Sequence, residues 1–320
     1  MVPLLTPPAA LVFGPVPSRR LGRSLGVNNI PPKVCSYSCV YCQAGRTTHL
    51  EIERRSIHEP ATIVWAVRTR LELAAARREQ VDYVTFVPNG EPTLDLGLGR
   101  AIDGIKRLGR SVAVVTNASL LWKRDVRDDL AAADWVSVKI DAARDSTWRR
   151  VNRPPRGLEL DRVLQGQRDF ARSYAGTLST ETMIVAGVND DPEELAAIAD
   201  HVGALRPTCA WLSVPVRPPT EPWVRRPDTA TVDRARDALA RRIGRVDCLT
   251  TREADQFSGT GDVARDVTAI AAVHPLGEAA VRELLREAGA DWSVLEALVE
   301  QGRLLRVEYE GERFYRAAPP

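Results

Sequence analysis

The chain has 320 residues, about two domains' worth, and 44% hydrophobic with 27% charged residues is the composition of an ordinary soluble protein with a sizeable core. Its 44 Lys and Arg against 42 Asp and Glu leave a net charge of +2, which excludes the basic excess that would by itself indicate a nucleic-acid binder. The apolar N-terminal segment is broken by five prolines, and no run of about 18 apolar residues occurs. We therefore expect no membrane segment, no signal peptide and a cytoplasmic location.

From about residue 81 onward, short β-rich runs alternate with longer amphipathic stretches. Such a repeat of strand and helix predicts a parallel sheet wound right-handedly. About six strands predict a curved, incomplete barrel, a partial parallel (β/α)6 barrel of the α/β class, with its functional loops at the C-terminal ends of the strands. The expected strands are 24–29, 81–87, 111–116, 135–140, 180–186 and 210–216, and the expected helices are 60–78, 96–108, 124–132, 158–172 and 192–204.

The pattern changes after Val216, where a Pro- and Arg-rich connection begins. A helix to about residue 242 and a short run at 246–250 follow it. The last segment then predicts three helices and an alternating hairpin that turns at Glu310-Gly311, the order of a small winged-helix-like domain. The expected division is a barrel domain over 1–250, a linker over 251–262 and the winged-helix-like domain over 263–320, with helices at about 263–273, 277–288 and 291–301.

The charge of this last domain bears on its partners. Residues 263–320 contain seven Arg and ten acidic residues, a net charge of −3, and the third expected helix carries acids without any cation. Such a face is unsuited to a groove lined with phosphates. DNA binding is therefore disfavoured, and we expect the domain to pack on the barrel, contact protein or cover substrate.

Three of the five cysteines, Cys35, Cys39 and Cys42, lie within eight residues as a C-x3-C-x2-C run. An odd number of cysteines in a chain of this length does not make a disulfide framework, so the cluster points to an inorganic centre. A structural zinc site normally closes with four ligands, and the nearest fourth candidate is His49. An iron–sulfur cubane held by only three cysteines leaves one iron open to another ligand.

With Tyr41 immediately before the third cysteine, this loop resembles the cluster-binding loop of the radical SAM enzymes, and the resemblance extends over roughly residues 13–216. It implies that the cysteines hold a [4Fe-4S] cluster whose open iron chelates S-adenosylmethionine (SAM), with Tyr41 near the adenine. It also implies a one-electron donor such as flavodoxin or ferredoxin. The reduced cluster then splits SAM into methionine and a 5′-deoxyadenosyl radical, which removes a hydrogen atom from the substrate.

The segment Asn89-Gly90-Glu91-Pro92, after the second expected strand, resembles the family's Gly-Gly-Glu motif. The resemblance implies that its backbone and Glu91 meet the SAM amino group. Asn89 stands where the family has its first glycine, which is a departure from the pattern. An ordinary strand-to-helix turn is the alternative interpretation, because Asn, Gly and Pro are turn residues.

Five polar residues on the next two strands are further candidates for binding the cofactor: Thr116, Asn117, Ser137, Lys139 and Asp141. Alternation predicts that the last three point inward, where an apolar core would not tolerate them unpaired. They are candidates for the SAM ribose, the SAM carboxylate or the substrate, and Ser137 resembles the family's ribose-contacting position. As alternatives, Thr116 and Asn117 cap the following turn, and Lys139 forms an internal salt bridge.

Residues 13–28 resemble the opening of one subgroup, the iron–sulfur oxidoreductases related to the wyosine-forming tRNA enzymes. Arg19 and Arg20 could meet an anionic substrate there, although a surface pair or salt bridge is favoured in an Arg-rich chain. The substrate stays open between a small molecule, a peptide and a tRNA base, and no residue can be assigned as general acid or base. A redox-sensing DNA-binding regulator and a zinc module are distant alternatives.

Overall fold

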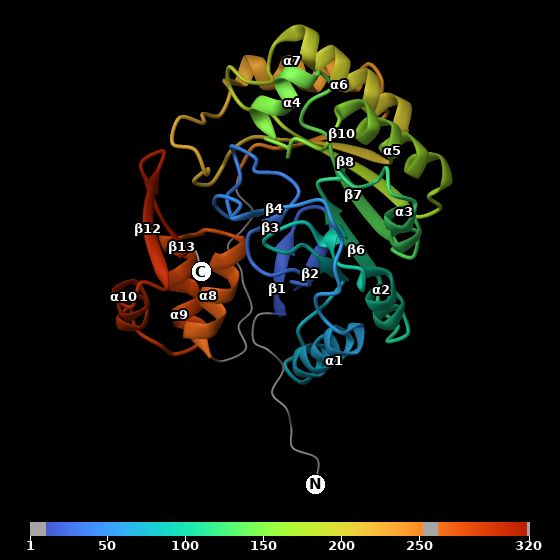
Figure 1. The fold of residues 1–320 in the computed structure, drawn as a ribbon. Helices are drawn as coiled ribbons and strands as arrows, with labels where there is room; N and C mark the ends of the chain where they lie inside the picture. Colours follow the sequence, from blue (N-terminus) through green and yellow to red (C-terminus); the bar gives the residue numbers. More distant parts are fainter. Residues whose placement is uncertain (1–10, 252–261, 319–320) are drawn as a thin grey trace.

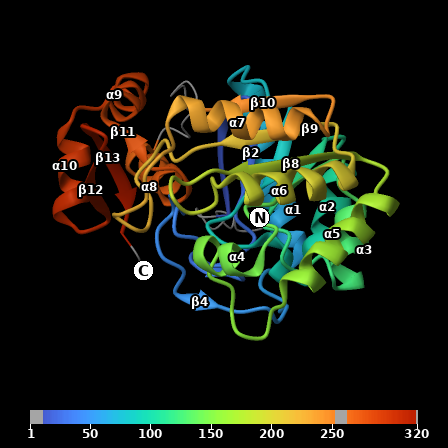
Figure 2. The same ribbon diagram turned by 90° about the horizontal axis from the view of Figure 1, so that it is seen from above.

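The computed structural model describes residues 11–251 and 262–318. Its main body is an α/β half-barrel, a curled sheet with helices on its outer face (Figures 1 and 2). Seven strands run parallel, and β1 pairs antiparallel with β2 at one edge. In spatial order the eight strands are β1 (Val12–Ser18), β2 (Gly22–Val27), β5 (Tyr83–Phe86), β6 (Val112–Thr116), β7 (Trp135–Lys139), β8 (Thr177–Met183), β9 (Cys209–Ser213) and β10 (Val246–Leu249).

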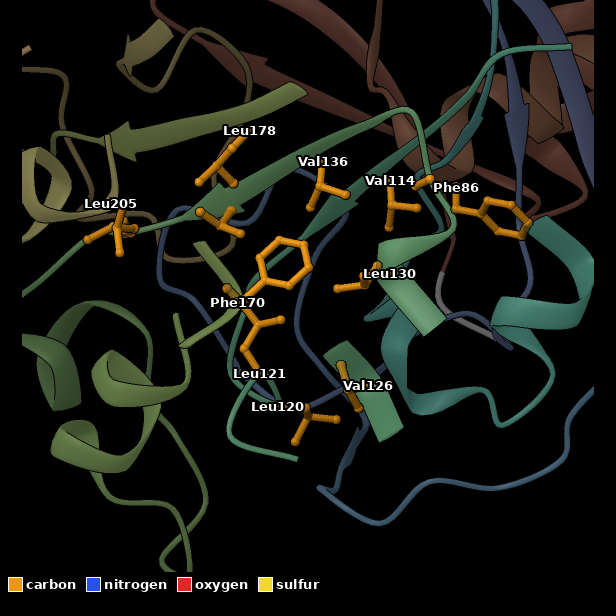
Figure 3. Packing of buried hydrophobic residues seen from close by; sticks show 14 of the residues in the cluster. Phe86, Val114, Leu120, Leu121, Val126, Leu130, Val136, Phe170, Leu178 and Leu205 are labelled. Carbon is orange, nitrogen blue, oxygen red and sulfur yellow. The ribbon is translucent and has the colours of Figure 1, made fainter. Parts of the chain in front are cut away.

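The outer helices bury one face of the sheet. Alternate strand residues such as Phe86, Val114 and Val136 pack against Leu130 and Phe170 of these helices (Figure 3). None of the helices in residues 11–251 and 262–318 combines the length and apolar composition that crossing a membrane requires. The helices are α1 (Pro60–Ala76), α2 (Leu98–Lys106), α3 (Arg124–Ala131), α4 (Asp145–Val151), α5 (Leu160–Ser173), α6 (Pro192–Leu205) and α7 (Thr229–Ala240), with a 3-10 turn, η1 (Pro92–Leu94), after β5.

The six strands and five helices expected for the barrel are present, but the sheet has eight strands, so the count of six was wrong. The additional strands are β1 and β10, which flank the predicted set. Pro15 and Pro17 hid β1 in the sequence, and an edge strand tolerates proline because one side of its backbone has no ladder partner. Strand β8 ends at Met183, earlier than expected, because Asn189 Oδ1 accepts the Val185 N–H at 2.8 Å.

The C-terminal unit, residues 262–318, contains the three expected helices and a small antiparallel sheet of order β11-β13-β12. It has an apolar cluster of its own, which includes Ile270, Leu284, Leu298 and Tyr315. The expected linker 251–262 falls almost wholly on residues 252–261, outside the described residues. The elements are α8 (Val263–Val273), β11 (Leu276–Gly277), α9 (Glu278–Glu287), α10 (Ser293–Glu300), β12 (Leu304–Tyr309) and β13 (Glu312–Ala317).

Candidate cofactor site

The cysteine loop begins in β3 (Val34–Cys35), which pairs in parallel with β4 (His49–Leu50) in a two-residue ladder. Side-chain amides approach two of the three sulfurs. Asn117 Nδ2 donates to Cys35 Sγ at 3.5 Å, and Asn152 Nδ2 donates to Cys39 Sγ at 3.4 Å. Hydrogen bonds of this kind stabilise negative charge on a thiolate, so both contacts suit sulfurs that bind a metal cluster.

The donor set fits an iron–sulfur cubane better than a single ion. Burial raises the pKa of the Cys35 thiol well above its usual range and that of Cys39 to about 12, so both sulfurs need a metal to release their protons. Among the described residues, no group of three or more His, Cys, Asp or Glu could hold one metal ion. In a cubane each thiolate binds its own iron, so the sulfurs surround the cluster without meeting at one point. His49, the candidate fourth zinc ligand, is exposed.

Glu91 is a buried carboxylate, 1% exposed, and its contacts are unusual. Oε1 accepts the Thr93 N–H at 3.1 Å and the hydroxyls of Thr93 and Thr116 at 2.6 Å each. Within residues 11–251 and 262–318, Oε2 accepts one hydrogen bond, from the Asn117 N–H at 2.8 Å. Burial outweighs these bonds and raises the pKa of Glu91. All the donors named are neutral, and Oε2 keeps acceptor capacity. The carboxylate is therefore suited to one further, polarised N–H donor.

Thr116 and Asn117 have two structural roles at the end of β6: they cap a turn and they bind the Glu91 carboxylate. Thr116 Oγ1 accepts the Ala118 N–H and Asn117 Oδ1 accepts the Ser119 N–H, each at 3.0 Å, so both residues cap the turn as the alternative interpretation expected. The same two residues also donate to Glu91. The turn after β6 and the Glu91 carboxylate therefore hold each other in place.

The backbone of the Asn89–Pro92 segment lies directly against the cluster loop. A Cβ on Gly90 would come within 2.1 Å of the Val34 carbonyl oxygen, so only glycine fits there. The next residue, Glu91, donates its N–H to the same oxygen at 3.1 Å, and the Pro92 carbonyl accepts from Asn29 Nδ2 at 3.0 Å. This close approach is what the resemblance to a Gly-Gly-Glu motif requires of its second glycine.

Asn89, which replaces the motif's first glycine, connects three parts of the molecule. Its Oδ1 accepts from Lys33 Nζ at 2.9 Å, and its Nδ2 donates to the Ala272 carbonyl at the end of α8 at 2.6 Å. Nearby, Gln43 Nε2 in the cluster loop donates to the Val273 carbonyl at 3.1 Å. The C-terminal unit is therefore attached to the segments on both sides of the candidate site.

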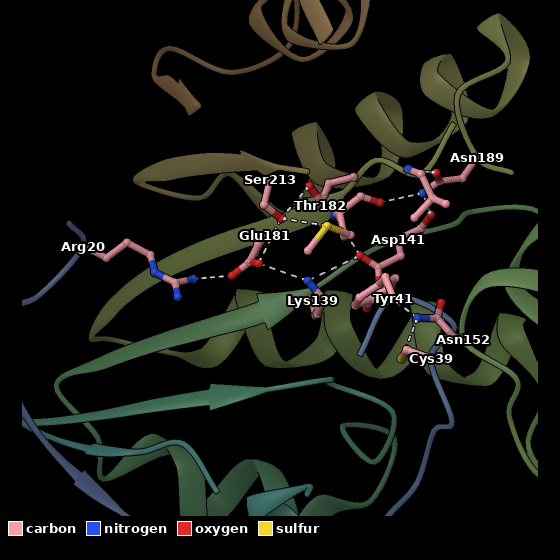
Figure 4. A network of polar contacts seen from close by, with 12 residues as sticks. Arg20, Cys39, Tyr41, Lys139, Asp141, Asn152, Glu181, Thr182, Asn189 and Ser213 are labelled. Atoms are coloured by element: carbon pink, nitrogen blue, oxygen red, sulfur yellow. Dashed lines mark hydrogen bonds and ion pairs between the residues drawn. The ribbon is translucent and has the colours of Figure 1, made fainter. Parts of the chain in front are cut away.

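A charged network lies on the concave side of the sheet (Figure 4). Lys139 pairs with Glu181 at 3.1 Å and with Asp141 at 3.6 Å, and Arg20 also pairs with Glu181. Tyr41 donates its hydroxyl to Asp141, and Lys139 Nζ lies 5.0 Å from the centre of the Tyr41 ring. The salt-bridge alternatives for Lys139 and Arg20 are thus what the structure shows.

Glu181 is the main residue of this network that the sequence analysis missed. Burial would raise its pKa, but Lys139 and Arg20 outweigh burial and hold the pKa well below its usual range. Its strand was expected over 180–186 as a β-rich run, without a role for any of its side chains. The available signal was a carboxylate near the start of that run, on the strand that neighbours Lys139. Asn152 also belongs here, because its Nδ2 donates to Asp141 Oδ2 at 2.8 Å.

Ser137 lies beside this network and pairs in register with Ser179 of β8. It is 1% exposed, and its Oγ has no hydrogen-bond partner among the described residues. A buried hydroxyl without a partner is costly and marks a place where a polar ligand atom can bind. The ribose contact expected for Ser137 stays a prediction.

The comparisons with known proteins agree with this geometry. The family model of the radical SAM superfamily matches residues 29–200, more than half of the chain. A UPF0026 protein of Methanocaldococcus jannaschii is 38% identical over 307 residues, 95% of each chain. A UPF0026 protein of Synechocystis is 38% identical over 209 residues, 65% of this chain and 76% of that protein.

A solved radical SAM methyltransferase from Sphaerobacter thermophilus shares the fold, with a TM-score of 0.54 at 17% identity over 72% of this chain and 67% of that one. Enzymes of this superfamily use a [4Fe-4S] cluster and SAM, for which the cysteine loop and the buried Glu91 carboxylate are suited. The chain therefore belongs to the radical SAM superfamily and, within it, to the UPF0026 family.

Proposed function

We propose that this enzyme holds its cluster on Cys35, Cys39 and Cys42 and binds SAM along the C-terminal ends of β5, β6 and β7. The observation that carries the proposal is the Glu91 carboxylate, which is buried against the cluster loop, contacted by neutral donors and left with acceptor capacity on Oε2. When bound, cluster and SAM supply the 5′-deoxyadenosyl radical that abstracts a substrate hydrogen. The chain's own task is to bind, orient and exclude water.

The residues around Glu91 have distinct roles in this proposal. Glu91 Oε2 accepts the amino group of SAM, and Thr116 and Asn117 orient the carboxylate for that contact. Gly90 lets the motif backbone lie against the cluster loop, where a side chain would collide with Val34. Asn89 and Pro92 hold the two ends of this backbone through their bonds to Lys33 and Asn29.

The adenosine moiety would extend over β7. Ser137 offers its unpartnered hydroxyl to the ribose, and Tyr41 offers its ring near the adenine. We assign Lys139 and Asp141 a positioning role, because both are occupied by each other and by Glu181. Asp141 fixes the Tyr41 hydroxyl, which keeps the aromatic ring of the cluster loop in place.

The substrate belongs inside the barrel in this proposal. Arg20 is paired with Glu181 on the concave side of the sheet, so its charge is offset and it is not available to a phosphate backbone. The acidic C-terminal unit, winged-helix-like in its order of elements, is attached beside the site through Asn89 and Gln43. These contacts favour a small molecule or peptide over a tRNA base. The resemblance of residues 13–28 to the opening of the wyosine-related subgroup supports membership of that subgroup. A cytoplasmic location is favoured because the cluster depends on low-potential electrons.

Anaerobic reconstitution with iron and sulfide, followed by dithionite and SAM, tests the proposal. Mass spectrometry should detect 5′-deoxyadenosine with the intact enzyme and with Cys248→Ala, a matched control because this cysteine lies on β10, away from the loop. Cys39→Ala should lose most of its iron and form no product. Stoichiometric zinc without sulfide in anaerobically purified protein would contradict the cluster assignment.

A further inference from the structure

The Pro- and Arg-rich segment 217–229 crosses the outside of the cluster loop. Thr220 Oγ1 donates to the Cys42 carbonyl at 2.7 Å, and Glu221 donates its N–H to the Val40 carbonyl at 3.0 Å. In both ribbon views the segment lies between α4 and the C-terminal unit (Figures 1 and 2). The backbone between Cys39 and Cys42 is thus hydrogen-bonded directly to a surface segment.

This surface combines a large exposed aromatic residue with arginines. Trp223 is 49% exposed, the largest such fraction among the exposed large apolar residues of the described chain. Arg46 and Arg153 both pair with Glu221 Oε1, at 3.2 and 2.5 Å, and the Arg46 side chain is 71% exposed. Exposed Trp and Arg together are typical of protein interfaces.

Two more arginines extend the same surface. Arg225 accepts the Ala186 N–H at its carbonyl at 3.0 Å, and Arg150 donates to the adjacent Gly187 carbonyl at 3.0 Å. Carboxylates also lie in this area, among them Glu221 and Asp190, which accepts the Gly187 N–H at 3.0 Å. We call the set Arg46, Arg150, Arg153, Trp223 and Arg225 the donor face.

We infer that the donor face docks an acidic one-electron carrier protein. The inference rests on the proposed function, because only a cluster that is reduced in each activation needs such a partner. One electron passes from the carrier's prosthetic group to the cluster through the loop at Cys42, so that the carrier is oxidised by one electron and the cluster is reduced by one. Positive charge around an aromatic contact steers an acidic partner and suits a small, short-lived interface.

A nucleic acid is the less suitable occupant of the same face. Glu221 pairs with two of the arginines and offsets part of their charge, so this face lacks the continuous basic surface on which binding to a phosphate backbone depends. An acidic protein can place its carboxylates on the rim cations and its prosthetic group against Trp223. The short route to the Cys42 backbone serves electron transfer and has no purpose in RNA binding.

The test compares two reductants by stopped-flow bleaching of the reconstituted cluster. The probes are an acidic flavodoxin in its fully reduced form and dithionite, which needs no docking. Arg46→Glu and Trp223→Ala should each slow reduction by flavodoxin at least tenfold at low salt and leave reduction by dithionite unchanged. Arg107→Glu, an exposed control just after α2 on the outer side of the barrel, should change neither rate.

Added salt should slow the wild-type reaction with flavodoxin and affect Arg46→Glu less, because the reversal removes part of the attraction. Equal slowing in the Arg107 control, or no slowing in either donor-face variant, would overturn the inference. So would unchanged flavodoxin kinetics together with weakened tRNA binding in Arg46→Glu. Failure of dithionite to reduce the wild-type cluster would instead contradict the proposed function, so the two failures are distinguishable.

Discussion

Replacing Glu91 by glutamine removes one charge from the site and keeps nearly the same shape. The carboxylate is buried and its Oε2 accepts a single bond from the part of the chain that the structure describes, so a SAM amino group there would make a charge-assisted hydrogen bond out of bulk water. Loss of such a bond costs about 1.5–3 kcal/mol, which corresponds to roughly 10- to 150-fold weaker SAM binding. Folding should not suffer, because burial already disfavours the charged form and raises the pKa of Glu91.

Thr116→Val is the matched comparison, since it removes one neutral hydroxyl that orients the same carboxylate at 2.6 Å. The loss of one such bond costs about 1 kcal/mol, or roughly fivefold in affinity. SAM affinity is measured by equilibrium dialysis on reconstituted protein, with iron content checked for each variant. Unchanged affinity in Glu91→Gln with a full cluster, or a larger effect in Thr116→Val, would refute the placement of the amino group.

The other predictions concern neighbouring parts of the molecule. Asn89→Gly restores the motif's glycine but removes the hydrogen bond to the C-terminal unit. The amide hydrogens of α8 should then exchange faster, and the free energy of unfolding should fall by about 1–2 kcal/mol. Unchanged exchange would contradict the contact. Asn152→Leu removes the N–H donor to Cys39, so a redox titration should give a more negative cluster potential, and an unchanged potential would argue against the bond. Burial lowers the pKa of His201 from 6.5 to about 4. As pH falls, the unfolded chain therefore binds a proton at this histidine before the folded chain does. Urea titrations should show the free energy of unfolding fall by up to about 3 kcal/mol between pH 6.5 and 4. The His201→Gln variant should lack this fall, and the variant His49→Gln, at an exposed histidine, should keep it.

Local patterns were sufficient to predict most of the barrel. The alternation of Ser137 and Lys139 predicted that their side chains share the inward face of the sheet. In the structure these two residues pair in register with Ser179 and Glu181 of the neighbouring strand. The helix expected at 192–204 does begin at Pro192, where Asp191 accepts the Glu194 N–H at 3.0 Å. Each of these features depends on residues that are close in the sequence or on a period that a single strand displays.

The parts that were missed depend on contacts between distant segments. Glu181 has a partner 42 residues away in Lys139 and another 161 residues away in Arg20, and neither pairing leaves a mark in the local sequence. The strand β1 was missed because its two prolines are tolerated only at a sheet edge, and edge position is a property of the whole topology. The donor face likewise joins Arg46 to residues of the segment 217–229.

Asn89 illustrates the same limit in the opposite direction. In the sequence it is a departure from a glycine motif and weakens the match. In the structure the glycine that sterics require is Gly90, because a Cβ there would meet the Val34 carbonyl, whereas the Asn89 side chain has room to reach a carbonyl 183 residues away. In this chain a glycine at position 89 would leave the Ala272 carbonyl and the Lys33 ammonium without this partner. The departure at position 89 thus corresponds to a tertiary contact, which joins the Asn89–Pro92 segment to α8 of the C-terminal unit.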